Sequence, residues 1–134
     1  MTVIANSGVN VAAWIFVAVA VVVALQALAD GIPRHAFDAT WPDHARFHLT
    51  WGVANQVGFC LTITAVALIP FRRSERWSWW VLLGFTLLGI FSLIPAALWQ
   101  GNGPRAGTEI PIALIVLALL VALAISAKVG FPRQ

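Results

Sequence analysis

Residues 9–29 have the sequence VNVAAWIFVAVAVVVALQALA, a run of 21 residues without a charged side chain. About 20 apolar residues in a helix, each rising 1.5 Å, cross the roughly 30 Å hydrocarbon core of a bilayer. Of the 134 residues of the whole chain, 60% are hydrophobic and 10% are charged, whereas soluble domains carry about 25% charged residues. The composition therefore predicts an integral membrane protein and excludes a water-soluble globule.

Three more apolar stretches follow the first one. We predict membrane spans at residues 9–29, 48–70, 78–99 and 110–127. Gly31 and Pro33 are expected to end the first helix. The hydroxyl of Thr40 is expected to cap the second helix by accepting an early backbone N–H, with Asp43 favouring the positive helix end. The predicted fold is one all-α domain, residues 1–134, with four transmembrane helices running up and down, either as a single chain or as a homodimer.

The distribution of basic residues predicts the orientation in the membrane. Four spans place both termini and residues 71–76 on one side, which carries five Lys and Arg residues against three on the other side. Because cytoplasmic loops are enriched in Lys and Arg, we expect both termini to lie on the cytoplasmic side. The protein would then be embedded in a bacterial inner membrane, with membrane lipids around its helices. Residues 1–10 carry no Lys or Arg, so the Ala27-Leu28-Ala29 stretch is not expected to be a signal-peptide cleavage site. No basic stripe with interleaved aromatic residues suggests a nucleic-acid partner.

The polar residues of the chain gather in residues 40–55, with the sequence TWPDHARFHLTWGVAN. His44, His48, Trp51 and Asn55 recur at spacings of four, three and four, which places them on one face of a helix. Asn55 lies at or inside the hydrocarbon, where an amide without a partner is costly. We therefore expect Asn55 to face the interior of the bundle or a cavity.

Other polar residues are expected at the same outer end of the bundle. Gln26 and Asp30 end the first span, and Gln100 and Glu109 flank the last connection. The hypothesis is a polar pocket above an apolar space. Its candidate catalytic residues are His44, His48, Asp30, Asn55 and Glu109, and its candidate substrate-binding residues are Trp51, Gln26, Arg46, Trp99 and Gln100.

Two kinds of chemistry fit the histidines. Two histidines four residues apart on a helix could share zinc or iron, with Asp30, Asp38 or Glu109 as a further ligand, although the Glu of an H-E-x-x-H motif is missing. A histidine beside a half-buried carboxylate could instead move protons on a lipid-like substrate, as in double-bond migration. The alternatives are structural: the histidines would bind lipid headgroups and water, and Arg46 would pair with Asp43.

These observations leave several functions open. The first hypothesis is a membrane enzyme or binder of a small lipophilic molecule, with isomerase-type acid–base chemistry as the enzymatic version. The second is a small dimeric transporter of the multidrug type, although residues 9–29 lack the acidic residue that such transporters carry in the first span. The third is an accessory subunit of a larger membrane complex.

Residues 41–48, WPDHARFH, resemble the W-P-x-H-A-R-F-H signature of small four-helix membrane proteins of bacteria and fungi, a family without an assigned activity. More loosely, the chain is similar to the four-helix EXPERA proteins, which include a sterol double-bond isomerase and the sigma-2 receptor. That similarity rests on a cluster of His, acid, Asn and Trp residues at one end of a small bundle, and it implies a pocket for a lipophilic ligand. The order of elements differs, so no catalytic residue is carried over.

Overall fold

The computed structural model describes residues 7–100 and 109–129, except for the side chains of residues 34, 35, 92–100, 109, 110 and 129. Throughout these residues the chain is helical between short connections, which confirms the predicted all-α fold with four helices. Two of the helices continue into π-helical segments. The elements are α1 (Ser7–Gln26), η1 (Ala27–Ala36), α2 (Asp43–Val66), η2 (Ala67–Phe71), α3 (Arg76–Gln100) and α4 (Glu109–Val129).

The lengths and compositions of these helices are those of an integral membrane protein. Three stretches are long and apolar enough to cross a membrane: Ser7–Pro33, Asp43–Phe71 and Pro111–Lys128. The side chains of α3 are described only as far as Phe91, and the apolar stretch that they form, Arg76–Phe91, is shorter than these three. Large apolar side chains such as Leu61, 66% exposed, cover the outside of the bundle, where lipid rather than water would surround them.

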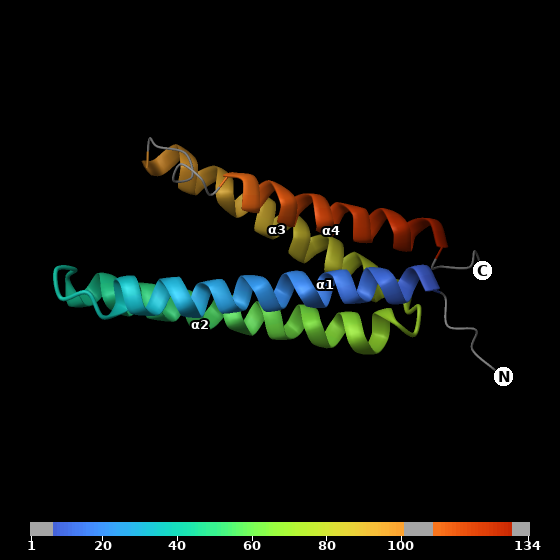
Figure 1. The fold of residues 1–134 in the computed structure, drawn as a ribbon, viewed down its shortest axis with the longest axis horizontal. Helices are drawn as coiled ribbons and strands as arrows, with labels where there is room; N and C mark the ends of the chain where they lie inside the picture. The colour runs from blue at the N-terminus through green and yellow to red at the C-terminus, as the bar shows by residue number, and fades with distance from the viewer. Residues whose placement is uncertain (1–6, 101–108, 130–134) are drawn as a thin grey trace.

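The four helices form two pairs that meet at one end. Figure 1 shows α1 and α2 side by side along their length, with α3 and α4 close to them near the start of α1 and the end of α4, and diverging toward the other end. The buried core lies at the closed end, where the rings of Phe16 and Phe71 meet edge to face at 5.8 Å between centroids. The indole of Trp79 ties α3 to α4 by donating to Ser126 Oγ at 3.1 Å. The bundle is therefore tightly packed at one end and open at the other.

The register of α1 against α2 is fixed at two points. Near the closed end, Arg72 Nε donates to Asn10 Oδ1 at 2.9 Å. Near the open end, a Cβ atom on Gly31 would lie 2.8 Å from Val53 Cγ2, so only glycine allows η1 to approach α2 this closely. Because the two helices are antiparallel and rise equally per residue, Gln26 lies at nearly the same membrane depth as Gln56.

The prediction that Gly31 and Pro33 end the first helix is wrong. The helix continues through both residues as η1 and ends at Ala36. In an α-helix, proline loses the bond to the carbonyl four residues earlier and clashes with it. The wider π-helical turn, in which each bond spans five residues, relieves this conflict. The same solution recurs at Pro70 in η2.

The prediction that Thr40 caps the second helix is also wrong. The helix begins at Asp43, and Pro42 precedes it without a side-chain cap. The hydroxyl of Thr40 donates to Asp38 Oδ1 at 2.6 Å, and the Thr40 backbone N–H donates to the same oxygen at 2.9 Å. An ionised carboxylate is a stronger acceptor than a hydroxyl. Thr40 therefore closes the turn before the helix.

Candidate functional site

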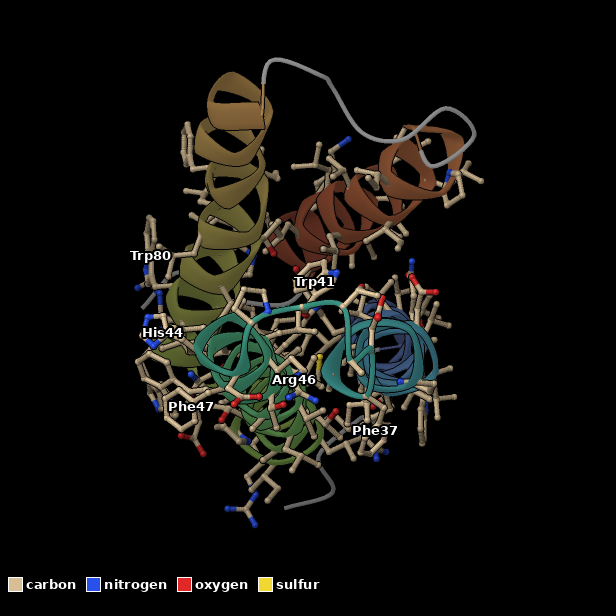
Figure 2. The ribbon with its side chains drawn as sticks, turned by 90° about the vertical axis from the view of Figure 1, so that its left-hand side faces the viewer. Phe37, Trp41, His44, Arg46, Phe47 and Trp80 are labelled. Atoms are coloured by element: carbon tan, nitrogen blue, oxygen red, sulfur yellow. The ribbon has the colours of Figure 1, made fainter. Side chains whose placement is uncertain are left out.

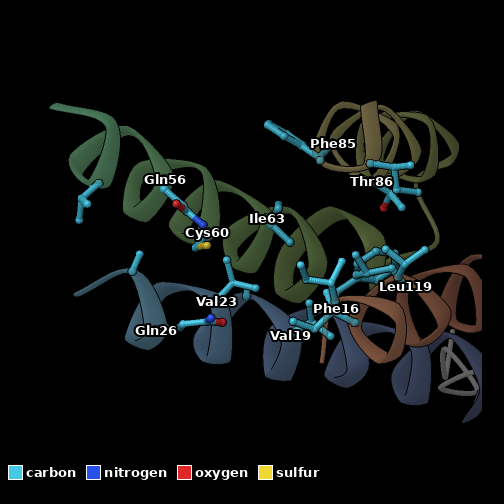
Figure 3. Close-up of a pocket in the computed structure, with 18 of the residues that line it drawn as sticks. Phe16, Val19, Val23, Gln26, Gln56, Cys60, Ile63, Phe85, Thr86 and Leu119 are labelled. Carbon is cyan, nitrogen blue, oxygen red and sulfur yellow. The ribbon is translucent and has the colours of Figure 1, made fainter. Parts of the chain in front are cut away.

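A cavity of about 510 Å³ lies between the four helices, and each helix contributes to its walls. Its apolar side chains include Phe16, Ile63 and Leu82 near the core (Figure 3). The polar residues of its lining lie between mid-depth and the open end. They are Gln26 and Asp30 from α1 and η1, Gln56 and Cys60 from α2, and Thr86 from α3.

Two glutamines face this cavity from neighbouring helices. Gln26 of α1 and Gln56 of α2 lie at about the same depth, and Figure 3 shows Gln56 extending from α2 toward α1. Neither side chain has a hydrogen-bond partner among the described residues. Each amide offers two N–H donors and one carbonyl acceptor, and leaving these groups unpaired in apolar surroundings is unfavourable. Both side chains are exposed as well as lining the cavity, so the pair is suited to binding a polar group at the open side of an otherwise apolar cavity.

The remaining polar residues of the lining are less available. Asp30 is half-buried and lies beside Gly31 at the open end. The Thr86 hydroxyl donates to the Leu82 carbonyl at 2.8 Å, so it retains only its capacity to accept. Cys60 is a buried free thiol. A polar ligand group at this end would therefore meet the two glutamine amides and the Asp30 carboxylate.

The two histidines lie elsewhere on α2. Their Nε2 atoms are 3.1 Å apart, and their ring centroids are 4.4 Å apart in an edge-to-face arrangement. Trp51 lies next to His48, with 6.2 Å between ring centroids. These residues and Asn55 are exposed, and the cavity lining does not include them. The structure thus brings His44, His48, Trp51 and Asn55 onto one helix face, as the spacing predicts, but not into the cavity.

The prediction that Asn55 faces the interior is therefore wrong for the single chain. The cavity side of α2 contains Val53, Gln56 and Cys60. At 100° of rotation per residue, the face that carries Asn55 lies about 120° around the helix from this side. Adjacent polar residues cannot both face inward, and Gln56 occupies the inward position. Gln26 and Asp30 are among the predicted site residues, whereas Gln56, Cys60 and Thr86 are not. The α2 spacing of 49, 53, 56, 60 and 63 is the pattern that could have revealed Gln56 and Cys60 as site residues.

Arg46 occupies a third side of α2. Figure 2 shows it between α2 and η1, whereas His44 and Phe47 point to the opposite side. Its guanidinium pairs with the Asp43 carboxylate, as the structural alternative expects. The other predicted site residues, Trp99, Gln100 and Glu109, have side chains that lie outside the described residues.

The described residues do not assemble a complete metal site. They contain no group of three or more His, Cys, Asp and Glu side chains that could hold a metal ion. His44 and His48 supply two ligands, whereas protein zinc sites use three or four, so these two side chains do not complete a site by themselves. The described cavity lining contains Asp30 but neither His44 nor His48, so no pairing of these histidines with a carboxylate is formed there.

No protein-family model, curated protein or solved structure matches this chain. The motif at residues 41–48 therefore stays a prediction of family membership. Trp41 and Pro42 of this motif lie in the turn before α2, and residues 43–48 form the first turns of the helix. Its two histidines, His44 and His48, are exposed. The cavity and the surface of α2 are therefore the two features of the structure that point to a function.

Proposed function

We propose that this protein binds a small lipophilic molecule in the cavity between its four helices. The observation that carries the proposal is the combination of a largely apolar cavity of about 510 Å³ with two glutamine amides at one end. Sites for small molecules typically have volumes of about 300–1,000 Å³ and a few polar groups that orient the ligand. The apolar part of the ligand would lie toward Phe16 and Leu82, deep in the bundle.

The polar end of the cavity defines the head group of the ligand. Gln26 and Gln56 each donate and accept hydrogen bonds, so a carbonyl, hydroxyl or amide group would satisfy both. Isomerase-type chemistry, the enzymatic version of this proposal, needs a proton-transfer group at the ligand. The sequence-based hypothesis gives this role to a histidine together with a carboxylate. Asp30 is the carboxylate in the described lining, so it is the group that would transfer the proton.

The orientation proposed from the sequence places the polar end of the cavity toward the outer side of a bacterial inner membrane. Figure 1 shows the connection between α2 and α3 at the same end of the molecule as the start of α1 and the end of α4. Arg72, Arg73 and Arg76 lie at this connection, and Lys128 lies in the last turn of α4. A cluster of positive charge at one end of the bundle supports a cytoplasmic location of that end.

Mass spectrometry of compounds that co-purify with the protein from its native membranes tests the proposal. The wild type is compared with the double variant Gln26→Leu/Gln56→Leu and with Gly89→Leu. Gly89 lines the cavity, and a Cβ atom there would meet nothing within 4 Å, so the leucine fills the cavity without a backbone clash. Thr62→Val is the matched control, because it removes a polar group from an exposed part of α2 outside the cavity.

We expect one enriched lipophilic compound in the wild type and in the control. Two lost hydrogen bonds of about 0.5–1.5 kcal/mol each lower the affinity by about five- to 150-fold in the double variant, and Gly89→Leu excludes the compound by volume. A wild type that carries nothing above the membrane background would contradict the proposal. Equal retention by all four proteins would also contradict it.

A further inference from the structure

One face of α2 remains uncovered along the whole helix. This α2 outer face is formed by His44, His48, Trp51, Asn55, Gly58 and Thr62, and each of these residues is exposed. All six lie within an arc of about 80° at 100° of rotation per residue. The face points away from the cavity. At its edge Phe59 meets Phe85 of α3, with 5.7 Å between ring centroids, but the six residues of the face itself remain exposed.

Asn55 is the costly member of this face. Counting about 20 residues back from Pro70 places the membrane boundary near residue 50, and Asn55 then lies about 7.5 Å inside the hydrocarbon. Its side chain has no hydrogen-bond partner among the described residues. Polar side chains at such depth almost always pair with one another, with backbone carbonyls or with water in a cavity. In the single chain, this amide would instead face lipid tails.

We infer that a second copy of this chain covers the α2 outer face, with the two Asn55 amides paired across the interface. In a membrane, a two-fold axis along the bilayer normal brings the same residue of both copies to the same depth. A carboxamide is complementary to itself, because each one donates and accepts. A different partner would need a matching polar group at this depth, whereas a second copy supplies one automatically.

The surroundings of Asn55 allow the two helices to approach. Gly58, one turn deeper on the same face, has open space where a Cβ atom would lie. Small residues at helix contacts let backbones come close in membranes. Trp51 is 59% exposed and would pack against the partner helix above the amides. The interface does not depend on the proposed ligand, because the cavity lies against another side of α2.

The test counts subunits of the full-length, fluorescently labelled protein in liposomes by single-molecule photobleaching at increasing protein-to-lipid ratios. We expect a reversible dimer in the wild type. Asn55→Leu should raise its dissociation constant by about three- to 30-fold, the effect typical of one interhelical polar contact in a membrane. Asn55→Gln keeps an amide and should retain the dimer. Leu28→Ala is the control, because Leu28 is exposed on η1 at the depth of Asn55.

A second measurement locates the contact independently of its strength. In a Cys60→Ala background, which removes the natural cysteine, Gly58→Cys should form a disulfide between copies on oxidation, and Leu28→Cys should not. The inference would be overturned if the protein stays monomeric in the bilayer at every protein-to-lipid ratio. It would also be overturned if each single copy is bound to a different protein instead of to a second copy. A dimer whose dissociation constant is unchanged by Asn55→Leu would overturn it as well.

Discussion

Replacing Gly31 by alanine should force η1 and α2 apart. The added Cβ would lie 2.8 Å from Val53 Cγ2, whereas ordinary van der Waals contact begins at 3.4 Å, so the two atoms must separate by at least 0.6 Å. Valine is stiff at χ1, so its methyl group cannot simply swing away. Overpacking of this kind typically costs about 1–3 kcal/mol.

The matched control is Gly84→Ala in α3, where a Cβ atom would meet nothing within 4 Å. Both changes replace a helical glycine by alanine, which by itself stabilises a helix by about 0.5–1 kcal/mol. The difference between the two variants therefore isolates the contact with Val53. We expect the free energy of unfolding of Gly31→Ala to lie about 1–3 kcal/mol below that of Gly84→Ala.

The assay is reversible unfolding by sodium dodecyl sulfate in mixed micelles, followed by far-UV circular dichroism. Adding Val53→Ala to Gly31→Ala removes the opposing methyl groups and should recover much of the difference. Equal unfolding free energies for Gly31→Ala and Gly84→Ala would refute the close approach of η1 to α2. A double variant that is no more stable than Gly31→Ala would refute the role of Val53.

Two further predictions concern packing and orientation. Trp79→Phe removes the indole bond to Ser126 and should lower the unfolding free energy by about 0.6–1.7 kcal/mol, the range for interhelical hydrogen bonds in membranes. Trp77→Phe should change it by less, because the Trp77 indole is exposed and donates to Glu75, two residues away on the same chain segment. Equal losses in the same unfolding assay would contradict this assignment. In the cysteine-free background, Thr40→Cys should react with a membrane-impermeant maleimide in intact cells and Ser74→Cys only after lysis, and the reverse pattern would show that the termini face outward.

The helices could be predicted from the sequence because their length and composition are dictated by the bilayer. The side of α2 that faces inward could not. In a soluble helix, an apolar stripe identifies the core side, but a membrane helix is apolar all round, and the adjacent Asn55 and Gln56 offered two rival inward directions. The helix ends were also misjudged, because Pro33 stops an α-helix but fits within a π-helical turn. Spacing grouped the histidines correctly without revealing which way they point.

Because the cavity lies between helices, three of which are long and apolar enough to cross a membrane, the bilayer itself would be the solvent from which the proposed ligand enters. Occupancy then depends on the mole fraction of the compound in the lipid rather than on its concentration in water. Each methylene group favours the lipid phase by about 0.8 kcal/mol, so lengthening an alkyl chain by one carbon would raise the apparent aqueous affinity about fourfold without any new contact with the protein. Compounds should therefore be ranked only after each dose is corrected for its partition coefficient.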